Sequence, residues 1–146
     1  MLGLWAFVRF LHVLSAAVWV GGQLVVSLLL MPVVRRRLAA DVRAEVLTDV
    51  GRRFGVWTGA GFLPVQIATG IALAAHHGVT WASLADPGYG RTLAAKLIVF
   101  VLVMAAAGGH GIARAAGRDG WARALALASL VGSVVIILLA TALATD

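Results

Sequence analysis

A run of 25 residues without a formal charge, Phe10–Val34, is the feature that most constrains the fold of this chain. At about 1.5 Å per helical residue, the run exceeds the ~20 residues needed to cross the hydrocarbon core of a bilayer. On a helical period its polar and small residues share one face, namely His12, Ser15, Ala16, Trp19, Gln23 and Ser27. We expect this face to point at other helices or at a cofactor, because unpaired polar groups are costly in lipid.

The composition extends the membrane prediction to the whole chain. Of its 146 residues, 62% are hydrophobic and 12% are charged, whereas soluble proteins average about 25% charged residues. The absence of cysteine excludes disulfides, thiolate metal sites and iron–sulfur clusters. The net charge of +6 comes from arginines in short loops beside apolar runs, which is typical of orientation signals. No nucleic-acid partner is therefore expected.

Apolar runs predict an all-α integral membrane protein, with a single domain over residues 1–146 and four helices packed as an antiparallel bundle. The spans are expected at about 4–34, 54–76, 92–114 and 124–144. In the last span, small residues predict close helix packing, namely Ala126, Ser129, Gly132 and Ser133.

The polar segment 35–53 separates the first two spans. It holds six arginines and three acids, and valines recur at every fourth position from Val42 to Val50 after Asp41, a candidate N-cap. This pattern predicts an amphipathic helix on the cytoplasmic membrane surface, and a solvated loop is the alternative.

The distribution of basic residues predicts the orientation. The first and third loops hold nine arginines, whereas the opposite side has only Arg9 and Arg91, with Lys96 just inside the membrane. By the positive-inside rule those two loops are cytoplasmic and both termini lie on the outer side of a bacterial-type inner membrane.

Three ionisable or ligating residues are expected at the same depth, near the outer face. His12 lies near the start of the first span, Lys96 near the start of the third, and His76 at the end of the second. A b-type haem needs axial ligands, an apolar slot and cations for its propionates. His12 is the candidate axial ligand, with Lys96 or His76 as the second and Arg9 or Arg91 as the propionate partner. His110 lies about 21 Å farther along the third span, toward the cytoplasmic side.

The first span also resembles a known family. The segment LHVLSAAVWVGG, with His12 seven residues before Trp19, and the later Met31-Pro32 and Arg35, resemble the first helix of the copper-resistance D (CopD) membrane domain. The same spacing is similar to the HemJ family of haem-binding protoporphyrinogen IX oxidases. Ala68-Thr69-Gly70 and Lys96-Leu97 fit both families, so the resemblance covers three of the four helices. It implies haem b, with His12 and Lys96 at the positions of the HemJ family's functional histidine and lysine.

The sequence leaves three functions open. The first is a haem-b redox protein that exchanges electrons between a quinone or other membrane partner and an outer-face donor or porphyrinogen-like substrate. With a porphyrinogen-like substrate it would be an oxidoreductase. The second is copper handling. The chain's three methionines cannot all meet at one Cu(I) site, which leaves a Cu(II) route through His12, His76 and His77. The third is a non-catalytic accessory subunit, as a homo-oligomer or within a larger membrane complex. The cofactor-binding candidates are His12, Lys96, His76, Arg9 and Trp19, and the metal candidates are His12, Lys96, His76 and His110.

Overall fold

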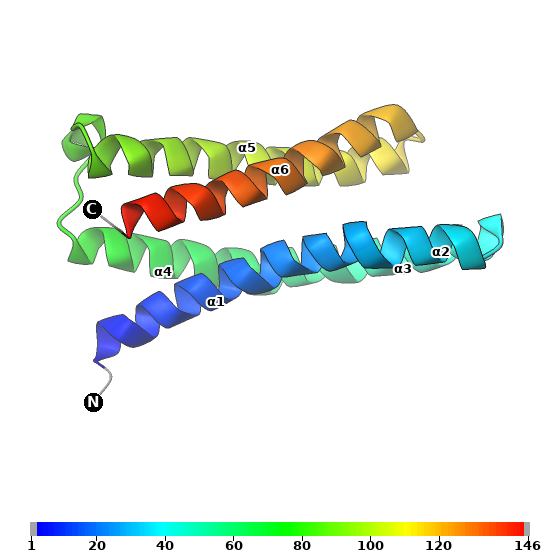
Figure 1. Ribbon diagram of the computed structural model, residues 1–146, viewed down its shortest axis with the longest axis horizontal. Helices are drawn as coiled ribbons and strands as arrows, with labels where there is room; N and C mark the ends of the chain where they lie inside the picture. Colours follow the sequence, from blue (N-terminus) through cyan, green and yellow to red (C-terminus); the bar gives the residue numbers. More distant parts are fainter. Residues whose placement is uncertain (1–2, 145–146) are drawn as a thin grey trace. The chain divides into compact units, whose positions relative to one another are not determined.

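A computed structural model describes residues 3–144 as two compact units, which meet in sequence between Gly78 and Val79. Each unit is a pair of antiparallel helices, which we call the first and the second hairpin (Figure 1). The described residues contain no β-strand. Four uninterrupted helices are long and apolar enough to cross a membrane. The predicted all-α class, with four helices of membrane-spanning length and hydropathy within the described residues, is thereby confirmed.

The first hairpin consists of two long helices joined by the short link Leu38-Ala39. Its first arm is one helix of 34 residues, Leu4–Arg37, and its second arm is one helix of 37 residues, Ala40–His76. Along the first arm the segments are α1 (Leu4–Leu24), the π-helical η1 (Val25–Leu30) and α2 (Met31–Arg37). Along the second arm they are α3 (Ala40–Val56), the π-helical η2 (Trp57–Phe62) and α4 (Leu63–His76).

Each π-helical segment ends two residues before a proline, Pro32 in the first arm and Pro64 in the second. Proline has no N–H, and within an α-helix its ring clashes with the carbonyl four residues earlier. A wider turn relieves that clash, and both arms show the five-residue spacing it requires. The N–H of Met31 bonds to the carbonyl of Val26, and the N–H of Leu63 bonds to that of Thr58. Both arms therefore pass their prolines without a break in the helix.

The second arm differs from the sequence prediction in where its helix begins. We expected a separate amphipathic segment over 35–53 and a span from residue 54. Instead, the helix starts at Ala40 and runs through to His76. The sequence between Val50 and Trp57 has no proline, and neither Gly51 nor Gly55 has a positive φ, so nothing interrupts the helix there. The helix predicted from the valine spacing exists, but it is continuous with the span.

The second hairpin follows a short 3-10 turn, η3 (Ala82–Ala85), and consists of α5 (Tyr89–Ala115) and α6 (Asp119–Leu143). Gly117, with φ of 69°, joins the two helices. Its N–H bonds to the carbonyl of Arg114 while the N–H of Arg118 bonds to that of Ala113, which is a Schellman motif. Helix α6 begins five residues earlier than predicted, with Asp119 in its first turn, where a carboxylate complements the helix dipole.

Small residues of α6 let it pack closely on α5, as the sequence predicted. Ser129 and Ser133 are buried, and the hydroxyl of Ser133 donates to the carbonyl of Ser129, which satisfies it within the helix. A Cβ added at Gly132 would overlap the Cγ2 methyl of Val103, itself buried on α5. Three residues of the predicted stripe, Ser129, Gly132 and Ser133, are therefore buried or in contact with α5, whereas Ala126 is exposed.

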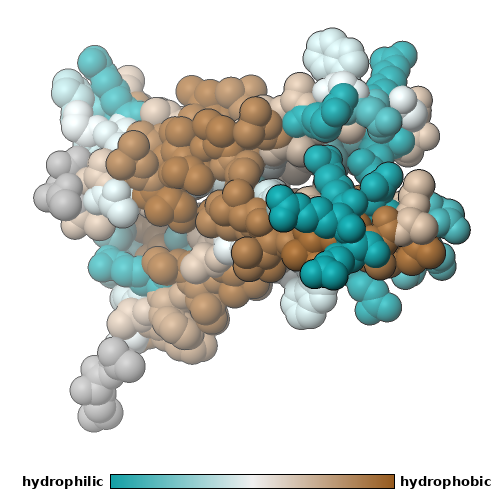
Figure 2. Space-filling view, turned by 45° about the vertical axis from the view of Figure 1, so that its right-hand side comes forward, coloured by the Kyte–Doolittle hydropathy of each residue, from teal (hydrophilic) through white to brown (hydrophobic). Residues whose placement is uncertain are grey.

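Large apolar side chains cover the outside of both hairpins. Val18, Ile71 and Leu138 are each 66% exposed, and Figure 2 shows extended hydrophobic surface. Surfaces of this extent on a water-soluble monomer would mark interaction sites. On helices of spanning length they are the surface expected to contact lipid acyl chains.

The Gly132–Val103 contact generates the first prediction. Gly132→Ala should lower the free energy of unfolding by about 1–3 kcal/mol, because the new methyl must displace Val103. Thermal or detergent-induced unfolding of the purified protein measures the change. Adding Val103→Ala should restore much of the loss, whereas Gly111→Ala, whose Cβ would meet no atom within 4 Å, should cost nothing. Equal destabilisation by both glycine variants would contradict this packing.

Candidate functional site

The two arms of the first hairpin meet along a seam of polar and aromatic contacts in constant register. Trp5 pairs with His76, His12 with Thr69, Ser15 with Gln66, and Trp19 with Phe62. From each pair to the next, both helices advance by the same number of residues, first seven, then three, then four. Residues at these spacings lie on one face of a helix. The seam runs over about 21 Å at 1.5 Å per residue.

His12 occupies the centre of this seam and contacts the opposite arm through both ring nitrogens. Its Nδ1 lies 2.9 Å from Oγ1 of Thr69, and its Nε2 lies 3.0 Å from Nε2 of Gln66. Thr69 and Gln66 are both buried, with 8% and 9% of their surfaces exposed. Ser15 extends the network, since its hydroxyl lies 2.6 Å from Oε1 of Gln66.

We assign the hydrogen-bond directions from the shortest contacts. The Thr69 hydroxyl donates to the carbonyl of Val65 at 2.5 Å, so its oxygen accepts from Nδ1–H of His12. The Ser15 hydroxyl lies 2.6 Å from Oε1 of Gln66 and 3.0 Å from the carbonyl oxygen of His12, and we assign its proton to the shorter contact. The Gln66 amide N–H then donates to Nε2 of His12, and the imidazole is neutral with its proton on Nδ1.

This tautomer is the one that a metal-ligating histidine needs when Nε2 is the ligand. Ligating histidines usually donate their other ring N–H to an oxygen acceptor, which fixes the ring orientation and makes the ligating nitrogen more basic. Thr69 supplies that acceptor here. Gly70 leaves room for the ring, because a Cβ at this position would lie 3.3 Å from Cε1 of His12. The site therefore presents one oriented nitrogen, Nε2 of His12, whose partner is the side-chain amide of Gln66.

Trp19 lies seven residues farther along the same face of α1. Its indole ring stacks on Phe62 with centroids 4.7 Å apart and an interplanar angle of 7°. The residue is 5% exposed, and its Nε1–H has no hydrogen-bond partner within residues 3–144. The candidate cofactor residue Trp19 is thus a buried aromatic with an unsatisfied donor.

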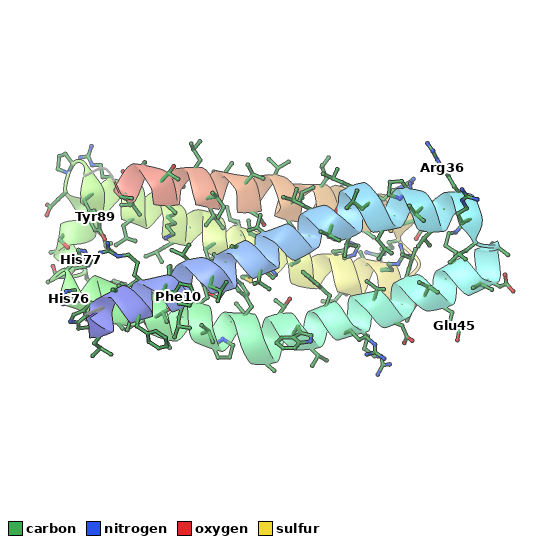
Figure 3. All side chains as sticks on the ribbon, turned by 60° about the horizontal axis from the view of Figure 1, so that its bottom comes forward. Phe10, Arg36, Glu45, His76, His77 and Tyr89 are labelled. Atoms are coloured by element: carbon green, nitrogen blue, oxygen red, sulfur yellow. The ribbon has the colours of Figure 1, made fainter. Side chains whose placement is uncertain are left out.

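His76 lies apart from His12. Its ring stacks on Trp5 with centroids 3.9 Å apart, and it is exposed at the end of α4 together with His77 (Figure 3). Since His12 pairs with Thr69, His76 is seven residues, or about 10 Å, farther along the seam. The first hairpin therefore does not bring His12 and His76 together as an axial pair. Arg9 is exposed on α1.

The second hairpin carries the two remaining candidates. Lys96 is half-buried on α5, in the second hairpin. His110 donates its Nδ1–H to the carbonyl of Ala122 at 2.8 Å and so connects α5 to α6. Within the described part of the chain, no group of three histidine or acidic residues is arranged to hold a metal ion.

Sequence reasoning found the face of α1 but missed its partners. Thr69 and Gln66 belong to the polar stripe of the second span, yet nothing in periodicity alone pairs them with His12. Phe62 and Trp5 went unnoticed for the same reason. A constant-register test for an antiparallel pair would have found all four contacts, because Trp5, His12, Ser15 and Trp19 have their counterparts on the second arm at matching spacing.

Comparison with known proteins adds no identification. No protein-family model matches the chain, and neither a curated protein nor a solved structure matches it. Functional inference therefore rests on the residues themselves and on the resemblance of the first span.

The Thr69 contact generates the second prediction. In protein labelled with ¹⁵N-histidine, the His12 ring should give the spectrum of the Nδ1–H tautomer. Thr69→Ser should preserve it, because serine keeps the hydroxyl, whereas Thr69→Val should abolish the preference and lower the unfolding free energy by about 0.5–2 kcal/mol. Comparison with His12→Ala identifies the resonance. An Nε2–H tautomer in the unmodified protein would contradict the assigned directions.

Proposed function

We propose that this chain is a membrane-embedded haem-b redox protein of the HemJ/CopD type. In this proposal the two hairpins form one antiparallel four-helix bundle in a bacterial-type inner membrane, with both termini on the outer side. The protein passes electrons between a quinone or other membrane partner and an outer-face donor or porphyrinogen-like substrate. The resemblance of the first span and the nine arginines of the first and third loops support this proposal.

The observation that carries the proposal is the orientation of His12. His12 has a hydroxyl acceptor on Nδ1 and a side-chain amide donor on Nε2. The amide of Gln66 reaches Nε2 from a side chain with rotatable bonds, so it is able to leave when a ligand takes its place. This combination suits a ligating role for Nε2.

In this proposal the first hairpin would supply one ligand of the haem. His12 would ligate through Nε2, and Thr69 would hold the proton at Nδ1. Lys96 is the proposed second ligand, as the resemblance implies, and Arg9 or Arg91 would neutralise a propionate. When bound, the haem supplies one-electron redox chemistry that the side chains themselves lack.

The chain's own residues then perform two tasks. Thr69, tied to the Val65 carbonyl, fixes the plane of the His12 ring. Gln66 covers Nε2 of His12, the nitrogen that would ligate the cofactor. Copper handling has no comparable observation in its favour, since the described residues form no cluster of three ligating side chains.

The third prediction tests the cofactor. Detergent-purified protein, supplied with haem during expression, should show a Soret band that shifts and sharpens on reduction with dithionite. His12→Ala should lose this band, while His77→Ala, an exposed histidine at the helix end, should retain it.

Two further results decide the proposal. Lys96→Leu should alter the oxidised spectrum without abolishing binding, because one axial ligand remains. Circular dichroism and gel filtration establish that each variant is folded. A featureless visible spectrum from the unmodified protein after haem supplementation would refute the haem proposal.

A further inference from the structure

We infer that Arg35, Arg36 and Arg37, in the last turn of α2, bind the phosphate of an anionic phospholipid. All three are exposed at the end of the first hairpin opposite to His76, where Figure 3 labels Arg36. The inference is independent of haem, because it uses none of the residues of the seam.

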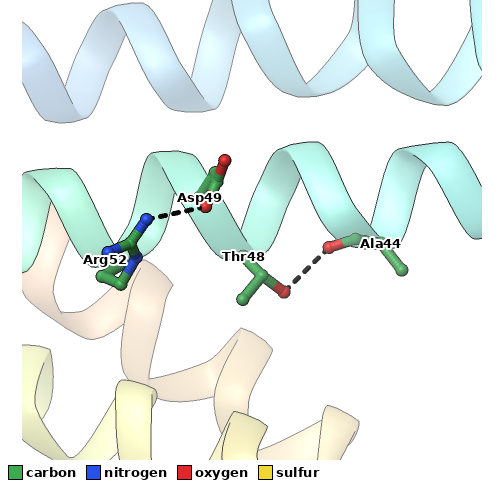
Figure 4. Close-up of polar contacts among 4 residues, drawn as sticks. All are labelled: Ala44, Thr48, Asp49 and Arg52. Carbon is green, nitrogen blue, oxygen red and sulfur yellow. Dashed lines mark hydrogen bonds and ion pairs between the residues drawn. The ribbon is translucent and has the colours of Figure 1, made fainter.

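No acidic side chain within residues 3–144 forms an ion pair with these arginines. Within residues 3–144 the one ion pair joins Arg52 to Asp49 at 3.1 Å, on the outside of α3 (Figure 4). No carboxylate of the described chain therefore pairs with Arg35, Arg36 or Arg37. Three consecutive arginines concentrate positive charge at this helix end, and an external anion offsets that charge.

The nearby acidic residues have other locations. Asp41 lies in the first turn of α3, where its carboxylate complements the helix dipole. Glu45 is exposed one turn later, and in Figure 3 its side chain and that of Arg36 point to opposite sides of the hairpin end. The segment 35–53 keeps a surplus of three positive charges, from six arginines and three acids.

The depth of the arginines matches that of lipid phosphates. Arg9 and Arg35 bracket the uncharged run and are 26 residues apart on one helix, or about 39 Å at 1.5 Å per residue. A bilayer measures about 40–45 Å including its headgroups. When the uncharged run spans the hydrocarbon core, both arginines lie in the headgroup layers.

The surface just before the arginines suits acyl chains. Leu28, Leu29 and Val33 are 64%, 63% and 57% exposed, and they lie within the two turns that precede Arg35. A phospholipid placed along this surface has its chains on the leucines and its phosphate at the guanidinium groups. This continuity of apolar and basic surface identifies the ligand as a lipid rather than a soluble anion.

The chemistry of the site favours an anionic headgroup. Guanidinium groups bind phosphate oxygens through paired hydrogen bonds. In phosphatidylcholine the headgroup carries its own cation, which competes for the phosphate and is repelled by the arginines. A headgroup without that cation, such as glycerol, leaves the phosphate charge to the protein.

The experiment measures lipid binding by the full-length protein in a neutral detergent at low ionic strength. Native mass spectrometry compares phosphatidylglycerol with phosphatidylcholine of identical acyl chains. We expect preferential binding of phosphatidylglycerol. Substitution of all three arginines by glutamine should weaken it on the order of 100-fold, since each basic residue near an anionic surface contributes about 1 kcal/mol. Substitution by lysine should weaken it less, because the charge remains but the paired hydrogen bonds do not.

The control variant is Arg52→Gln/Arg53→Gln, which removes two exposed arginines of the same hairpin and should leave binding within about twofold. Melting curves verify that all variants are folded. Equal binding of phosphatidylcholine, equal loss in the control, or full retention by the lysine variant would overturn the inference in favour of diffuse charge attraction. Competition by millimolar inorganic phosphate would overturn it in favour of a soluble anion.

Discussion

Lipid offers no hydrogen-bond partners, so polar side chains on spanning helices must satisfy one another. The first hairpin meets this constraint with a seam in which His12 and Ser15 face Thr69 and Gln66. The network extends from the Val65 carbonyl through Thr69 and His12 to Gln66 and Ser15. The register of the two arms is thus a consequence of this requirement.

The features that the sequence predicts best here are those that depend on hydropathy and side-chain size. Apolar run lengths predicted four spanning helices, and small residues predicted the α6 surface that packs on Val103. Helix ends were less predictable. The polar segment 35–53 has the charge of a surface loop, yet its only break is the link Leu38-Ala39, and the second arm is one continuous helix from Ala40.

The candidate site required contacts that no single-helix pattern contains. Periodicity placed His12 on a polar face, but only the pairing of α1 with α4 assigns its partners and its tautomer. The sequence prediction grouped His12 with His76 by their expected depth in the membrane. In the structure Thr69 is the residue opposite His12, and His76 lies two helical turns farther along, opposite Trp5. That His12 and Lys96 lie close enough to ligate one haem stays a prediction.

The two π-helical segments set the angular relation between the ends of each arm. A π-helical turn holds one residue more than an α-helical turn, and each residue rotates an α-helix by about 100°. Shortening η1 by one residue would therefore swing α2 around the axis and turn Arg35 away from its present side, while the His12 face stayed in place. Pro32 and Pro64, by requiring these wider turns, govern which way the basic end of the hairpin faces.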